Sequence, residues 1–292
     1  MFIDIHAHAY RIPFMQLDGV PPWPRPEDLL PYYDRIGVEK AVLLPIVAPE
    51  SYMPQTNEEI IEAAQRFPDR FIPFCNIHPQ IRGSNPHFPI EKLLAKYVDA
   101  GCRGVGEVMV NRPFLDPLMR NLFRAVNELK LPLTFHLSAT PFAGYGIADA
   151  PGLPGLDRTL SSYPDIKFLG HSGPFWAEIS VLDLPGDRAS LPKGKVREGA
   201  LPKLMRKHPN LYGDLSARSG ANALMRDEEY AVKFLTEFQD RLFFGLDICS
   251  IPVPDFHEQL PLFLKRLLAK KKISREVFDK VAHRNAEKLL GL

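Results

Sequence analysis

Eight short hydrophobic runs alternate with segments of helical pattern along this chain of 292 residues. Most of the runs are nearly continuous in valine, isoleucine, leucine and phenylalanine, which is typical of parallel strands covered on both faces. They occupy residues 2–8, 41–47, 71–78, 103–110, 131–137, 166–171, 211–215 and 242–248. Eight repeats of strand and helix predict an α/β fold, a (β/α)8 barrel of the TIM type, rather than an open doubly wound sheet.

The segments between the runs carry the helical pattern. They are expected at residues 26–36, 56–66, 90–100, 117–129, 156–163, 198–207, 228–239, 257–270 and 275–290. Barrels of this kind run to about 250 residues as one unit, and no linker or low-complexity tract divides the sequence. We therefore expect a single domain over residues 1–292 with extended βα loops. Segment 173–195 is long enough to form a lid or a pocket wall.

Composition narrows the classes of function. Lysine plus arginine (36) nearly balance aspartate plus glutamate (35), which offers no electrostatic case for nucleic acid or a membrane surface. Three widely spaced cysteines, Cys75, Cys102 and Cys249, suggest free thiols in a reducing compartment. We see no signal peptide and no apolar stretch that spans a bilayer, so a soluble cytoplasmic protein is expected. No glycine-rich dinucleotide turn is present, which argues against a nicotinamide enzyme.

Ionisable side chains stand at the ends of several predicted strands. His6 and His8 end the first run, and because they are two apart on a strand their imidazoles face the same side. The others end the fourth, fifth, sixth and eighth runs: Glu107, His136, His171 and Asp247. The carboxyl ends of barrel strands converge on one mouth, where active sites lie. The clustering of metal-competent groups there predicts a metal centre.

Each member of this cluster has its own expected role. The two N-terminal histidines and His136 are expected to be ligands, because buried imidazoles otherwise need polar partners. Glu107 is a ligand, a bridge between two metals, or a hydrogen-bond acceptor for a histidine. His171 is a ligand or a proton shuttle, since imidazole titrates near neutrality. Asp247 is expected as a ligand and as the general base.

A second group of residues is expected to contact the substrate. Arg11, Arg112 and Arg218 lie just past predicted strand ends, where a guanidinium can clamp a substrate carboxylate through two hydrogen bonds. A role as ordinary surface arginines is the alternative for each. Trp176, in the segment 173–195, is expected to form a wall of the pocket or the core of a lid.

The chain resembles the amidohydrolase superfamily, in particular its amidohydrolase-related branch of metal-dependent hydrolases and decarboxylases. The resemblance runs from end to end and rests on segments 3–8, 131–136, 163–173, 210–216, 241–247 and 285–292. It implies a divalent metal held by His6, His8, His136 and Asp247. It also implies that His171 is the catalytic acid/base or a ligand of a second metal.

Two departures from that branch bear on the site. Leu246 stands where the branch usually has serine or threonine before the last aspartate. Glu107 resembles, in its position on the fourth strand, a glutamate of TatD-like nucleases that bridges two metals. The number of metal ions therefore stays open at one or two. Imidazole and carboxylate ligands suit Zn²⁺, the expected metal, and also Mn²⁺ or Fe²⁺.

The sequence thus predicts a metal-dependent hydrolase of a small molecule, such as a lactone, ester or amide, including one that bears a carboxylate. A metal-activated water would be the nucleophile. A non-oxidative decarboxylase of an aromatic or enoic carboxylic acid is the alternative. A TatD-like nuclease is less well supported, because the charge is nearly balanced and no basic stripe is present. A small-molecule substrate is the expected partner, and a homodimer is an open expectation, as dimers are common among soluble proteins.

Overall fold

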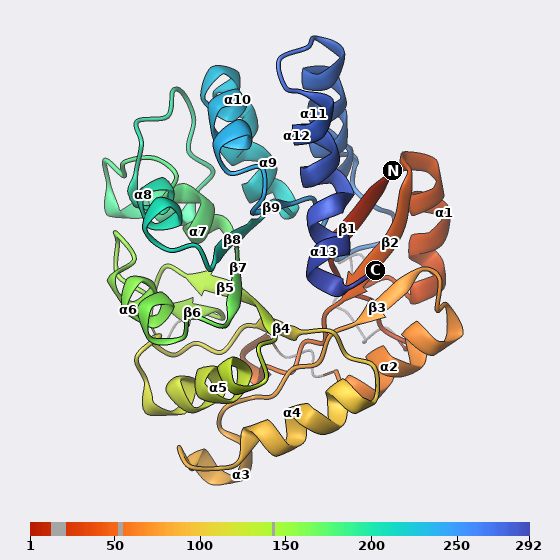
Figure 1. The fold of residues 1–292 in the computed structure, drawn as a ribbon, viewed down its shortest axis with the longest axis vertical. Coiled ribbons are helices and arrows are strands. Elements are labelled where there is room, and N and C mark those ends of the chain that lie inside the picture. Colours follow the sequence, from red (N-terminus) through yellow and green to blue (C-terminus); the bar gives the residue numbers. More distant parts are fainter. Residues whose placement is uncertain (13–21, 52–54, 142–143) are drawn as a thin grey trace.

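A computed structural model describes residues 1–12, 22–51, 55–141 and 144–292. Within these residues, parallel strands run through the centre and helices surround them (Figure 1). The strands are β1 (Phe2–Ala7), β2 (Val38–Leu43), β3 (Phe71–Pro73), β4 (Val105–Val108), β5 (Pro132–Ser138), β7 (Lys167–His171), β8 (Leu211–Asp214) and β9 (Leu242–Phe243), with the short β6 (Ile147–Ala148) beside β5. The α/β architecture expected from the alternating pattern is confirmed.

Several helices begin at residues whose side chains cap them. Thr56 accepts a hydrogen bond from the Glu59 amide (3.1 Å), and Asp116 accepts one from the Leu118 amide (2.8 Å). The helices are α1 (Pro26–Ile36), α2 (Asn57–Arg66), α3 (Ile81–Ser84), α4 (Ile90–Asp99), α5 (Pro117–Glu128), α6 (Pro154–Ser162), α7 (Gly173–Ala177), α8 (Ala200–Lys207), α9 (Ala217–Met225), α10 (Glu228–Glu237), α11 (Gln259–Ala269), α12 (Arg275–Asp279) and α13 (Asn285–Leu290).

The strands form two parallel sheets, β1-β2-β3 and β4-β5-β7-β8-β9, and backbone hydrogen bonds join both pairs of edges. On one side, the Cys75 amide donates to Gly104 O, and the Gly106 amide donates to Cys75 O, both at 2.9 Å. On the other side, the Ile5 amide donates to Phe244 O (3.0 Å). The two sheets are therefore joined into one ring, and the carboxyl ends of the strands meet at one mouth.

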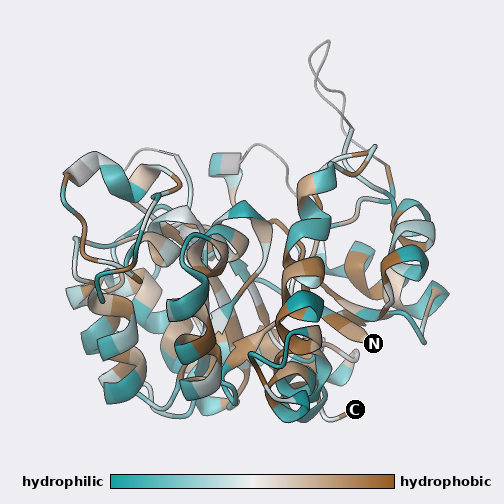
Figure 2. Ribbon diagram, turned by 90° about the horizontal axis from the view of Figure 1, so that it is seen from above, coloured by the Kyte–Doolittle hydropathy of each residue, from teal (hydrophilic) through white to brown (hydrophobic). Residues whose placement is uncertain are grey.

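Apolar side chains fill the inside of the ring. A buried cluster there includes Ile5, Leu44, Phe74, Leu169 and Phe243, contributed by strands or the residues that follow them. Residues of α13, which lies against β1 in Figure 1, join the same cluster. Figure 2 shows mainly hydrophobic colour in the central strands and mixed colour on the outer helices. The side chains at the mouth therefore rest on a packed apolar layer.

Some element boundaries differ from the sequence prediction. β3 ends at Pro73 and β9 at Phe243, so the chain reaches Asp247 without a regular ladder. The segment 173–195 contains α7 and the 3₁₀ helix η2 (Pro185–Ala189), and α9 follows β8 where no helix was expected. No helix of the described residues combines the length and the apolar character needed to cross a bilayer.

Candidate metal centre

The two histidines of the first strand are buried, and each has one ring nitrogen fixed by an acceptor. Nδ1 of His6 lies 2.6 Å from Oδ2 of Asp214, and Nδ1 of His8 lies 2.9 Å from the Leu44 carbonyl oxygen. A carbonyl or a carboxylate accepts hydrogen bonds, so both Nδ1 atoms carry the proton. Both Nε2 atoms are then left with a lone pair.

The two Nε2 atoms face each other and two carboxylates. Nε2 of His6 lies 3.1 Å from Nε2 of His8. Oε2 of Glu107 lies 3.4 Å from each of these nitrogens, and Oδ1 of Asp247 lies 3.6 Å from each. Four lone-pair atoms that converge without a proton between them repel one another unless a cation lies among them. Bonds of about 2.1 Å to a tetrahedral zinc place ligand atoms about 3.4 Å apart, which matches these distances.

Opposite charges shift the titration of the buried groups. Burial by itself would raise the pKa of Glu107, but the charge of His6 and the hydrogen bond from His136 hold that pKa well below its usual value. The pKa of Asp247 is lowered in the same way, against burial, by His6 and His171. Burial would lower the pKa of His6, yet Asp214, Asp247 and Glu107 raise it. The carboxylates therefore require positive charge beside them: a bound cation supplies it while the imidazoles stay neutral, and without a cation a second proton on His6 supplies it.

His136 and His171 flank these groups. Nδ1 of His136 donates to Oε1 of Glu107 at 2.8 Å. Nε2 of His171 lies 3.4 Å from Oδ2 of Asp247 and 3.9 Å from Oε1 of Glu107, and its Nδ1 lies 2.8 Å from the Ser216 hydroxyl. The structure thus brings together all the strand-end groups that the sequence singled out. His136 reaches the centre through Glu107 rather than through the two N-terminal histidines.

Asp247 occupies a turn that favours its residue type. Its φ of 55° lies in the left-handed region, which aspartate and asparagine tolerate better than most residues. The Asp247 amide donates to the His6 carbonyl oxygen (2.9 Å), which ties this turn to the first strand. Oδ1 also accepts from the Cys249 thiol at 3.1 Å. Cys249, one of the three cysteines expected to be free thiols, therefore contacts a candidate metal ligand.

Two further side chains at the centre were not assigned from the sequence. Asp214 is fully buried and orients His6, and its position at the end of β8 is the signal that could have found it. Trp23 packs edge-on against His8, with ring centroids 5.8 Å apart. It lies in an irregular segment, so no periodic pattern marked it.

The expected substrate contacts lie in different surroundings. Arg11 is exposed, and its Nε lies 3.9 Å from Glu62. Arg112 donates to Asp116 at 2.9 Å. Both arginines are thus engaged with carboxylates of the protein itself.

Trp176 is almost completely buried, and its Nε1 donates to the Asp214 carbonyl oxygen at 2.8 Å. It therefore lies in the core behind the centre rather than on an open wall. Arg218 is exposed, and its guanidinium stacks on Phe256, 4.3 Å from the ring centroid. It lines a pocket described below.

Comparison with known proteins gives one family match. The family described as Amidohydrolase matches residues 3–292. No curated protein sequence matches this chain closely enough to indicate a relationship.

Several solved structures share the fold. A probable 2-pyrone-4,6-dicarboxylic acid hydrolase from Acinetobacter baumannii is 16% identical, with a TM-score of 0.61, over 100% of this chain and 99% of that chain. The 5-carboxyvanillate decarboxylase LigW from Sphingomonas paucimobilis is 19% identical, with a TM-score of 0.57, over 90% and 82%. A 5-carboxyvanillate decarboxylase from Novosphingobium aromaticivorans, complexed with manganese, is 17% identical, with a TM-score of 0.56, over 90% and 79%. At these identities the likeness establishes the fold alone.

Proposed function

This chain belongs to the amidohydrolase family, and we propose that it is a metal-dependent hydrolase of a small molecule. The observation that carries the proposal is the convergence of four lone-pair atoms, from His6, His8, Glu107 and Asp247, within 3.1–3.6 Å of the two imidazoles. Such a set suits a divalent cation, because in neutral imidazoles that carry their proton on Nδ1 no member of the set has a proton to donate to another.

We assign the cation to His6, His8 and Asp247, with Glu107 as a further donor and His136 beside it. Zn²⁺ is the proposed metal, with Mn²⁺ and Fe²⁺ as alternatives, since imidazole and carboxylate donors suit all three. Glu107 would hold either one ion, together with the histidines, or two ions, so the proposed number of ions is one or two. When bound, the metal supplies an acidified water and polarises a substrate oxygen.

Asp247 and His171 have different roles in the proposed proton transfer. Oδ1 of Asp247 faces the two Nε2 atoms, and its Oδ2 faces Nε2 of His171 at 3.4 Å. Asp247 is therefore placed to take the proton of the attacking water and to pass it to the leaving group. His171 stabilises the charge of that carboxylate and is itself oriented by the Ser216 hydroxyl.

A decarboxylase is the second candidate. It is favoured by the decarboxylases among the structural relatives. In that reaction the same centre would hold the substrate carboxylate, and Asp247 or His171 would deliver a proton to the carbon that loses carbon dioxide.

The test is an assay of the metal-loaded protein against a panel of lactones, esters and amides and a panel of hydroxybenzoates. Release of acid from the first panel is the expected result, and release of carbon dioxide alone would replace hydrolysis with decarboxylation. Asp247→Asn should lower kcat/KM by about 10²–10⁴-fold, because the general base is lost.

Asparagine tolerates the backbone conformation of this position, so Asp247→Asn should keep the fold, which circular dichroism checks. Lys203→Gln, a neutralising change on the exposed face of α8, is the control and should keep full activity. Turnover that survives both Asp247→Asn and a chelator would refute the proposal.

A further inference from the structure

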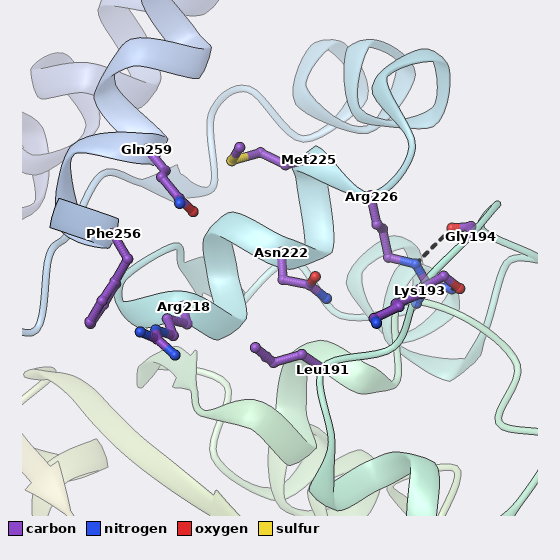
Figure 3. Close-up of a pocket in the computed structure, with 9 residues that line it drawn as sticks. All are labelled: Leu191, Lys193, Gly194, Arg218, Asn222, Met225, Arg226, Phe256 and Gln259. Carbon is purple, nitrogen blue, oxygen red and sulfur yellow. Dashed lines mark hydrogen bonds between the residues drawn. The ribbon is translucent and has the colours of Figure 1, made fainter. Parts of the chain in front are cut away.

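A pocket of about 450 Å³ lies beside α9, outside the group of candidate metal ligands. Figure 3 shows its walls, formed by segment 191–194, by α9, and by the chain from η3 (Asp255–Glu258) into α11. Its volume is in the range of small-molecule sites. We propose that this pocket binds a small organic anion, a carboxylate or a phosphate attached to an apolar body.

The charged side chains that line the pocket are all positive. Lys193 and Arg218 approach it from different walls, and none of the nine residues drawn in Figure 3 is an aspartate or glutamate. Among the described residues, no carboxylate lies within ion-pair distance of Lys193 or Arg218. The nearby Asp227 is already occupied, because it pairs with Lys195 (3.2 Å) and accepts from the Val196 amide (3.0 Å). The two cations therefore attract an anion that the protein does not supply.

The pocket also offers apolar surface. Leu191 and Met225 are 42% and 37% exposed, and Phe256 lines the same pocket (Figure 3). The guanidinium carbon of Arg218 lies 4.3 Å from the centroid of the Phe256 ring, so a cation–π contact holds the charged group against the apolar surface of the pocket. An anion with an apolar body satisfies both features, whereas an inorganic ion uses only one of them.

The outer wall of the pocket is held in place by hydrogen bonds. Arg226 donates to the carbonyl oxygens of Gly194 and Lys193, both at 2.9 Å. Asn222 donates to the Pro192 carbonyl oxygen at 3.0 Å. These contacts attach segment 192–194 to α9, so the site exists before a ligand arrives and less ordering is required on binding.

Residues of the pocket are neighbours along the chain of residues that contact the metal centre, but the pocket shares none of the candidate ligands. Arg218 follows Ser216, which pairs with His171, by two residues. Phe256 precedes His257, whose Nδ1 donates to the Leu246 carbonyl oxygen at 2.9 Å. The inference therefore stands independently of the proposed hydrolase, since nothing in it requires a metal.

The test is calorimetric titration at low salt with three probes: phenyl phosphate, inorganic phosphate and benzyl alcohol. Phenyl phosphate should bind at least about threefold more tightly than inorganic phosphate, because it also buries apolar surface. Lys193→Gln and Arg218→Gln should each weaken phenyl phosphate binding by about three- to tenfold. Lys203→Gln, an exposed lysine away from the pocket, should leave it unchanged.

A comparison of the metal-loaded and the chelated protein separates this pocket from the metal centre. The affinity for phenyl phosphate, which depends on Lys193 and Arg218, should change by less than about twofold after chelation. The proposal is overturned if binding disappears with the metal, if both charge variants bind phenyl phosphate as the wild type does, or if benzyl alcohol binds equally well.

Discussion

The protonation of His6 is set by a residue far away in the chain. Oδ2 of Asp214 accepts from Nδ1 of His6 (2.6 Å), while Oδ1 accepts from the Ser216 amide (3.0 Å). Both oxygens of one buried carboxylate therefore act as acceptors, which only an ionised aspartate does at full strength. The result is an Nε2 lone pair aimed at the neighbouring histidine.

Asp214→Asn should weaken metal binding by about 10- to 100-fold. Asparagine has one acceptor oxygen, so it can serve either His6 or the Ser216 amide but not both. Competition against a metal chelator of known affinity measures the effect. Asp69→Asn, an exposed change elsewhere, is the control. An unchanged affinity would mean that Asp214 does not orient His6.

Strand alternation explained only part of this arrangement. It predicted that His6 and His8 face one side, and their Nε2 atoms are 3.1 Å apart. Strict alternation would also place Asp4 with them, but Asp4 accepts from the Tyr33 hydroxyl of α1 (2.8 Å). The register of β1 against β2 is irregular between Asp4 and Ala7. An irregularity of this kind leaves no mark in a hydrophobic pattern.

Among the elements, the long segment after β7 is anchored by a buried ion pair. Nε of Arg188, in η2, lies 3.0 Å from Oε1 of Glu178, and both side chains are almost fully buried. Arg188 also donates to the Asp149 carbonyl oxygen, which connects η2 to the chain after β6. Burial lowers the pKa of Arg188 and raises the pKa of Glu178, so each charge depends on the other.

Arg188→Met should lower the free energy of unfolding by about 3–5 kcal/mol, because it leaves the buried Glu178 carboxylate without its cationic partner, with the Gly152 amide as a donor (3.1 Å). The double variant Glu178→Gln with Arg188→Met removes both charges and should recover most of that loss. Denaturant unfolding of the two variants and the wild type measures both values. If the double variant is as unstable as the single one, the ion pair is not the cause.

At the scale of the whole molecule, the sequence predicted the order of strands and helices. It did not predict which residues of distant elements contact one another. Thr56 and Asp116 stand at helix starts where capping residues are expected, and the hydrophobic runs gave the strands. Pairs such as His6 with Asp214, or Trp176 with the Asp214 carbonyl oxygen, depend on how the ring closes. Closure fixes which strand ends face one another across the mouth, and that geometry is not encoded in any single segment.

The candidate ligands come from the first strand, from β4 and from the turn after the last strand. A cation bound among them therefore joins the two ends of the ring. At a metal concentration 100-fold above its dissociation constant, binding should stabilise the folded state by about 2.7 kcal/mol. For a chain of this size, that corresponds to a rise in Tm of about 4–5 °C.

Differential scanning calorimetry of the metal-loaded and the chelated protein measures this rise. His8→Ala removes one ligand, so its Tm should no longer respond to the chelator. A wild-type Tm that is equal with and without chelator would show that no cation bridges these elements.

The apolar layer beneath the mouth has a kinetic consequence. Ile5, Leu44, Phe74, Leu169 and Phe243 occupy the inside of the ring, and α13 packs against the same layer. These side chains block passage along the barrel axis. In the proposed reaction, substrate and product therefore enter and leave through the same mouth. A slowly departing product then competes directly with the next reactant for entry.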